Sequence, residues 1–140
     1  MDKSGNKIID ISNSAETARY IVSVLIEKKA LDVKLFNVAK DSSVTDYYVN
    51  ATGRSSTQVA SLADEVVYKA DLIGYKAHRV EGRGGNSWLL VDFGDVVVNI
   101  FDKPSREFYN FDRLLPQEAN EDISDIIREV DEKFNIEQKD

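Results

Sequence analysis

The chain has 140 residues, of which 42% are hydrophobic, and it contains two prolines, seven glycines and no cysteine. This size and composition suit one packed domain, and the lack of cysteine excludes a disulfide framework, a thiolate nucleophile and a cysteine-ligated metal site. No apolar run reaches the roughly 20 residues of a membrane span, and no apolar signal region follows residues 1–7. The sequence therefore predicts a soluble cytoplasmic protein without a membrane partner.

The net charge of −7 is concentrated near the C-terminus. Residues 117–140 carry nine acidic and three basic side chains, whereas residues 1–116 carry 16 acidic and 15 basic ones. We therefore expect a core domain over residues 1–116 and an acidic, helical tail over residues 117–140. Because clustered Lys and Arg bind phosphate backbones, this distribution predicts at most incidental contact with RNA.

The first part of the chain predicts a helix followed by two strands. Apolar residues recur at helical spacing over residues 14–30, and Ser14 is the expected N-cap. Residues 31–39 have the pattern of a strand, and the aromatic and β-branched run at residues 47–49 begins a second strand. The polar turn between these runs predicts that the two strands are neighbours.

The turn Gly53–Ser56 joins the second strand to a second helix. Ser55 and Gln58 fit a capping box, and an apolar stripe then continues to Gly74. A small-residue turn before a helix N-terminus can hold an anion or nucleotide, because the first helical N–H groups lack backbone partners. Most such turns only cap their helix, so the residues leave both interpretations open.

The next segment predicts three further strands. Residues 76–81 have the pattern of a short strand, and the glycine-rich residues 82–87 form a loop. Residues 88–91 and 96–101 predict a hairpin in which Gly94 supplies a positive φ. Both hairpin strands are apolar enough that we expect helices to cover the sheet.

Two helices complete the predicted order. Residues 105–115 predict a short helix with Phe108, Phe111 and Leu115 packing inward, and residues 123–134 predict an amphipathic tail helix. The order α-β-β-α-β-β-β-α indicates an α/β fold with a mixed sheet flanked by helices and an extra C-terminal helix.

The candidate catalytic groups do not form a recognisable set. Nucleotidyltransferases combine a Gly-Ser turn with paired metal-binding carboxylates on one strand, but residues 76–81 contain no such pair, and Asp92 and Asp95 flank a turn. His78 is the only histidine and has no evident acid or base partner for a triad. The residues therefore favour a protein that is not an enzyme and has no metal or cofactor. A nucleotide-binding or nucleotidyltransferase-like enzyme that uses the Gly53–Ser56 turn is the alternative.

Aromatic residues are the clearest candidates for binding a partner. Trp88, the only tryptophan, begins a predicted strand beside a polar loop. Such a residue is either an exposed binding anchor or a core residue at the sheet edge, and periodicity favours neither. Tyr47 and Tyr48 point to opposite faces of their strand, so one of the two rings is a candidate contact.

Six short motifs follow one another through residues 14–116. They are Thr45-Asp46-Tyr47-Tyr48-Val49, Ala51-Thr52-Gly53, Ser55 with Gln58-Val59, Glu81-Gly82, the run from Trp88 to Val98, and Arg106-Glu107-Phe108-Tyr109. In their order and spacing, these motifs resemble the ribosomal silencing factor family, RsfS or Iojap. The tail after Pro116 lies outside the resemblance, and the family often has histidine where Asn99 stands.

The resemblance implies a nucleotidyltransferase-like fold without established catalysis and a role in translation. Members of the family bind the large ribosomal subunit through the ribosomal protein numbered fourteen, and block subunit joining sterically when nutrients are short. A role in large-subunit maturation and a homodimer are further implications. By motif position, the resemblance implies that Trp88, Asp92 and Asp95 contact the partner. Further implied contacts are Tyr48, Glu81 and Tyr109.

Overall fold

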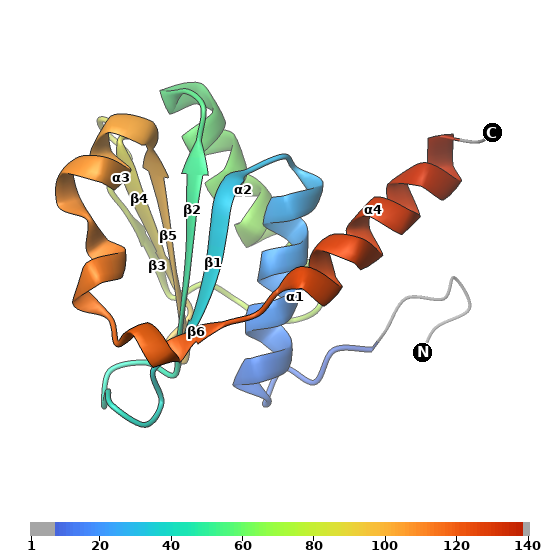
Figure 1. Cartoon of the computed structure of the whole chain (residues 1–140), viewed down its shortest axis with the longest axis horizontal. Helices are drawn as coiled ribbons and strands as arrows, with labels where there is room; N and C mark the ends of the chain where they lie inside the picture. The colour runs from blue at the N-terminus through green and yellow to red at the C-terminus, as the bar shows by residue number, and fades with distance from the viewer. Residues whose placement is uncertain (1–7, 139–140) are drawn as a thin grey trace.

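Six strands form one mixed sheet in the order β3-β4-β5-β2-β1-β6 in the computed structural model, which describes residues 8–138 (Figure 1). The parallel pair is β2 with β5, and the other neighbours are antiparallel. The strands are β1 Leu31–Asn37, β2 Tyr47–Gly53, β3 Arg79–Glu81, β4 Trp88–Asp92, β5 Val96–Asp102 and β6 Asn120–Glu121. The predicted mixed α/β fold is confirmed, and β6 is a strand that the sequence did not predict.

Helices lie on both faces of the sheet (Figure 1). The helices are α1 Ser14–Glu27, α2 Ser56–Leu72, α3 Lys103–Tyr109 and α4 Ser124–Gln138, and two 3₁₀ turns are η1 Phe111–Leu114 and η2 Gln117–Ala119. The first face is covered by α1 and α2, whereas α3 packs on β5 and β2 from the other side. The sheet is therefore the middle layer, and its second face is covered only in part.

The main core lies between the sheet and the first helical layer. Alternate residues of β2 and β5, such as Val49 and Val98, are fully buried there. They pack in one cluster with Leu25 of α1 and with Val59 and Leu62 of α2. Successive side chains of a strand point to opposite faces, so the intervening residues of β2 and β5 project toward α3.

Local capping corrects the predicted start of the first helix. Asn13, not Ser14, is the N-cap of α1, because its side-chain oxygen accepts the Glu16 N–H at 3.2 Å. The Ser14 hydroxyl instead donates to Asp46 at 3.1 Å. The predicted Ser55 cap of α2 and the positive φ of Gly94 are both confirmed.

The helix predicted over residues 105–115 is the shorter α3, Lys103–Tyr109, and it turns a different side toward the sheet from the one predicted. Asp102 caps α3 through the Ser105 N–H at 2.9 Å, and Asn110 ends it in the left-handed conformation at φ 49°. Phe108 is 81% exposed, so its predicted inward packing is wrong. Arg106 occupies the buried side of α3 instead.

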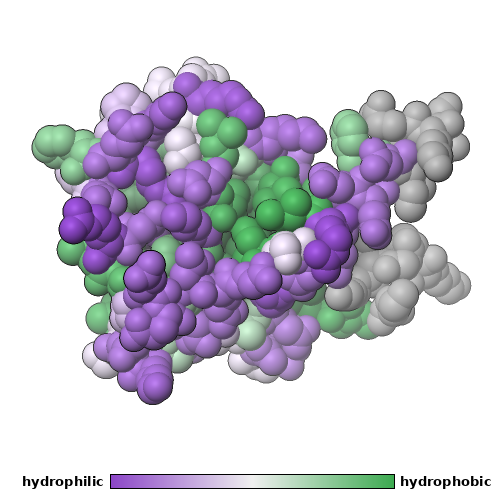
Figure 2. Space-filling model, viewed as in Figure 1, coloured by the Kyte–Doolittle hydropathy of each residue, from purple (hydrophilic) through white to green (hydrophobic). Residues whose placement is uncertain are grey.

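The C-terminal segment joins the sheet before it forms a helix. Asn120 and Glu121 pair with Phe36 and Leu35 of β1, and α4 then crosses α1 (Figure 1). Buried Ile126 is the main apolar contact of α4 with the core. An apolar patch lies between β1 and α4, with mostly hydrophilic residues around it in this view (Figure 2). Residues 1–7 and 139–140, which begin the predicted core and end the predicted tail, lie outside the described residues.

Candidate functional site

The uncovered part of the second sheet face is the candidate site. We call it the open face and define it by Arg79, Glu81, Trp88, Leu90 and Asp92, which project from β3 and β4 on the side opposite α1 and α2. Their neighbours in β4 point the other way and are fully buried, whereas the five residues of the open face are half-buried or exposed. Strand alternation thus places aromatic, apolar and charged side chains on one accessible surface.

Aromatic rings gather at the end of the open face nearest α3. The ring centroid of Trp88 lies 4.9 Å from that of buried Phe101 and 4.9 Å from that of Tyr109, which is half exposed. Phe111 lies 6.0 Å from Trp88 and 5.2 Å from Tyr48. Trp88 is therefore neither fully buried in the core nor fully exposed, because it packs between buried Phe101 and the solvent-exposed ring of Tyr109. Three predicted contact residues from three elements come together here.

Two of the predicted carboxylates share one arginine. The Nε of Arg79 lies 2.9 Å from a carboxylate oxygen of Glu81 and 3.1 Å from one of Asp92. Asp92 also accepts the Gly94 N–H at 2.8 Å and so supports the β4–β5 turn. The Arg79–Glu81 pair is exposed, and exposed ion pairs contribute little to stability, so Glu81 can exchange partners at low cost.

Asp95 lies apart from the other candidates. Its carboxylate accepts a hydrogen bond from Tyr75, which is buried with the helical layer, and its carbonyl accepts the N–H groups of Asp46 and Tyr47 at 3.0 and 3.1 Å. These bonds connect the β4–β5 turn to the start of β2. The structure therefore gives Asp95 a role in holding the turn, and its predicted contact with a partner stays a prediction.

Two buried asparagines support Trp88, and the sequence analysis missed their role. The Trp88 indole N–H donates to Asn99 Oδ1 at 3.0 Å, and Asn99 Nδ2 donates to Asn50 Oδ1 at 3.1 Å. Both asparagines are fully buried, so neither contacts a partner directly. The available signal was a polar amide in the middle of the apolar run Val96–Phe101, since buried polar groups need hydrogen-bond partners.

The Gly53–Ser56 turn is occupied by capping bonds. Ser55 Oγ accepts the Gln58 N–H at 3.1 Å, and the Gln58 side chain in turn accepts the Arg54 N–H. A Cβ at Gly53 would lie 2.8 Å from Val59 Cγ2, so this glycine allows α2 to approach β2 closely. The turn thus has a complete structural explanation.

Among residues 8–138, no group of three or more His, Asp or Glu side chains is placed to hold a metal ion. None of the described helices has the length and apolar composition needed to cross a membrane.

The fold and the open face define an α/β protein in which part of one sheet face is left uncovered beside an aromatic cluster. A family model described as "Ribosomal silencing factor during starvation" matches residues 11–140. The chain therefore belongs to the ribosomal silencing factor family, RsfS.

Individual relatives agree with this assignment. The ribosomal silencing factor RsfS of Bacillus subtilis is 38% identical over 88 residues, which are 63% of this chain and 75% of the relative. The mouse "Mitochondrial assembly of ribosomal large subunit protein 1" is 27% identical over 67% of this chain and 42% of its own length. A crystal structure of a protein from Chromobacterium violaceum superposes with a TM-score of 0.67 at 29% identity, covering 76% of this chain and 87% of that one.

Proposed function

We propose that this protein silences ribosomes by binding the large ribosomal subunit through its open face and preventing the small subunit from joining. Membership of the RsfS family supports the ribosomal role. The partner on the subunit is the ribosomal protein numbered fourteen, and the effect is steric, so no catalytic step is required. Because the mouse relative is named for assembly of the large subunit, we extend the proposal to maturation of that subunit.

The observation that carries the proposal is the half-buried Trp88 at the edge of an exposed charged strand pair. Interfaces concentrate their binding energy in a few aromatic residues that lose water on association. The carboxylates of Glu81 and Asp92 lie on the same sheet face as Trp88, and the exposed Glu81 can exchange Arg79 for a basic side chain of the partner. Charges in this position mainly increase the association rate and the specificity.

The first test is co-sedimentation of the protein with isolated large and small subunits, followed by a subunit-joining assay. We expect binding to the large subunit alone and reduced joining. Trp88→Ala should weaken binding by about 30-fold or more, because loss of a central aromatic contact costs roughly 2 kcal/mol or more. Glu81→Lys should weaken it further by slowing association.

Matched variants make this test specific. Tyr68→Ala removes an exposed aromatic side chain from α2, on the opposite side of the sheet, and should leave binding unchanged. Asp95 is left intact because changing it would break the Tyr75 hydrogen bond. Equal binding by wild type and Trp88→Ala would refute the open face as the site. Sedimentation of the free protein as a Trp88-dependent dimer would show that a second copy competes for the same face.

A further inference from the structure

We propose that Asp112 and Arg106 are positioning residues that hold Trp88 in its partner-facing orientation through a one-way relay of side-chain hydrogen bonds. The relay continues from Asn99 and Asn50 to η1: Asn50 Nδ2 donates to Asp112 Oδ1 at 2.7 Å. The relay therefore runs from the Trp88 indole N–H on β4, through one asparagine on β5 and one on β2, to the Asp112 carboxylate in η1. The partner-facing part of this inference rests on the proposed function, whereas the relay itself is a property of the free protein.

The end groups determine the direction of the relay. An ionised carboxylate only accepts hydrogen bonds, so Asn50 must turn its Nδ2 toward Asp112. The Asn50 oxygen then faces Asn99 and accepts a hydrogen bond from Asn99 Nδ2. The Asn99 oxygen is therefore turned toward Trp88, where it accepts the indole N–H. The indole N–H can only donate. Reversing either amide would therefore place two donors opposite each other on one side of that amide and two acceptors on the other side. With both amides buried, a reversed amide would lose hydrogen bonds that water cannot replace.

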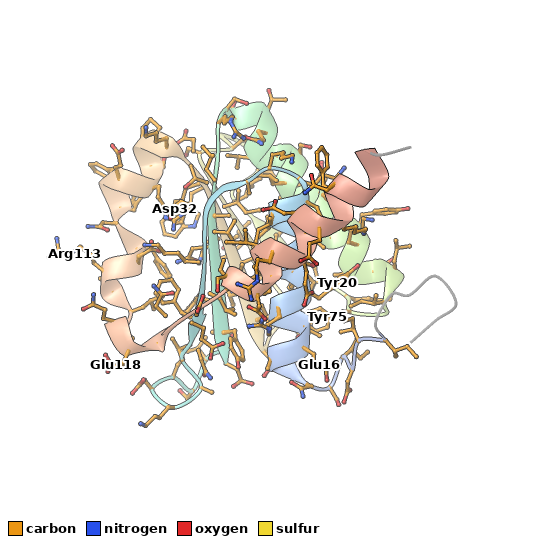
Figure 3. All side chains as sticks on the ribbon, turned by 45° about the vertical axis from the view of Figure 1, so that its right-hand side comes forward. Glu16, Tyr20, Asp32, Tyr75, Arg113 and Glu118 are labelled. Atoms are coloured by element: carbon orange, nitrogen blue, oxygen red, sulfur yellow. The ribbon has the colours of Figure 1, made fainter. Side chains whose placement is uncertain are left out.

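Arg106 holds the carboxylate end in place. Its Nη2 and Nε donate to Asp112 Oδ2 at 2.8 and 3.3 Å, and its Nη1 donates to Thr52 Oγ1 on β2 at 2.9 Å. The Arg106 side chain is only 8% exposed, and Asp32 on β1 lies 3.6 Å from its Nη2 on the side that faces α3 (Figure 3). The guanidinium thus ties α3, η1 and the sheet together at one point.

The segment that ends the relay also supplies the rings around Trp88. Tyr109 and Phe111 flank Asn110 and lie between Arg106 and Asp112 in the chain. Both rings contact the Trp88 ring. Loss of the Arg106–Asp112 pair would therefore release the indole N–H and the two neighbouring rings together.

The experiment uses the single tryptophan of the chain as its own probe. Asp112→Ala should make hydrogen exchange of the one indole N–H, followed by ¹⁵N NMR, at least tenfold faster, and should weaken large-subunit binding at least tenfold. Exchange of the Val49 and Val98 backbone amides in the same spectra reports global opening, and we expect it to change less than threefold. A purely structural role would accelerate all three sites alike.

Two further variants complete the test. Arg113→Ala removes the adjacent side chain of η1, which is exposed and projects away from the sheet (Figure 3), and should leave indole exchange and binding unchanged. If Asp112→Ala does not fold, Arg106→Lys replaces it, because lysine keeps the charge but cannot donate to Asp112 and Thr52 in the same geometry. We expect it to accelerate indole exchange about threefold.

The outcomes separate the two proposals. A folded Asp112→Ala protein with wild-type indole exchange would overturn the relay. Faster indole exchange with undiminished subunit binding would overturn the positioning role. Failure of the wild-type protein to bind any subunit would overturn the proposed function, while the relay would still be judged from the exchange data alone.

Discussion

At the scale of single residues, Gly53 has the sequence context of a phosphate-binding turn, but its role in the structure is to let α2 pack closely against β2. A glycine before a helix N-terminus is typical of phosphate-binding turns. In this protein the space that a side chain would need is filled by Val59, whose N atom also lies 3.0 Å from the position of a Cβ. Because both atoms belong to Val59, which is fully buried in the first turn of α2, neither can move aside without shifting the helix.

We predict that Gly53→Ala lowers the free energy of unfolding by roughly 1–3 kcal/mol, the usual cost of overpacking a tight contact. Chemical denaturation of the purified variant measures this change. The control is Gly85→Ala in the β3–β4 loop, where a Cβ meets nothing within 4 Å and φ is not positive. That change should alter stability by at most about 1 kcal/mol, in the stabilising direction, because alanine restricts the unfolded chain. Equal effects at both positions would refute the packing explanation.

At the scale of elements, one tyrosine joins the end of α2 to the β4–β5 turn. Tyr75 stacks on Phe93 at a centroid distance of 4.6 Å and donates its hydroxyl hydrogen to Asp95. Burial raises the pKa of the Tyr75 phenol above its usual value of 10.0, and the hydrogen bond to Asp95 raises the pKa further. The hydrogen bond requires the neutral phenol, so high pH should loosen this junction.

The sign of the pH effect follows from linkage. Above pH 10.0 the unfolded chain loses the Tyr75 proton while the folded protein keeps it, so the unfolded state binds fewer protons and stability falls as pH rises. We predict that wild type is more stable than Tyr75→Phe at neutral pH. The difference in stability between the two proteins should shrink by about 1.4 kcal/mol for each pH unit above 10.0. Denaturation from pH 7 to 11 measures the difference, with Tyr68→Phe on the exposed side of α2 as the control. A constant difference across this range would contradict the assignment.

At the scale of the whole molecule, the charge of the chain opposes general binding to RNA. The net charge is −7, and acidic residues are most concentrated after residue 116. Proteins that neutralise phosphates release counterions, and their binding weakens steeply with salt. A protein that binds the ribosome through another protein should depend on salt much less.

We predict that the logarithm of the binding constant for the large subunit falls with the logarithm of salt concentration with a slope shallower than about −3. A protein that contacts six to ten phosphates would show a slope of roughly −5 to −9. Co-sedimentation between about 50 and 300 mM KCl covers the range in which such slopes differ clearly. A slope of roughly −5 or steeper would contradict this prediction and would show that the protein binds the subunit mainly through RNA phosphates.

Local signals predicted most elements of the fold. Long amphipathic periods defined α1, α2 and α4, because each stripe must face a core. Short elements were less predictable: β6 has two residues and forms only because β1 presents an unpaired edge. The face of α3 was also unpredictable, since a seven-residue helix has too few positions to define an apolar stripe, and it buries Arg106 rather than Phe108.

The candidate site was predicted in part. The structure brings Trp88, Tyr48 and Tyr109 into one aromatic cluster and places Glu81 and Asp92 on the same sheet face as Trp88, while their contact with a partner stays a prediction. Asp95 is three positions from Asp92, yet the turn directs its carboxylate to the helical layer. The asparagine relay was missed because it joins residues 11 to 62 positions apart in the chain.

The sequence by itself determined the class of fold, the Ser55 cap and the Gly94 turn, and, through its ordered motifs, the family. These properties depend on residues that are close in the chain, whose periodicity and hydrogen bonding act locally. Only the tertiary structure decided which side chains share the open face and how Trp88 is supported. The reason is that strand order and register bring distant residues together, and a shift of one residue in either strand would send every side chain to the opposite face.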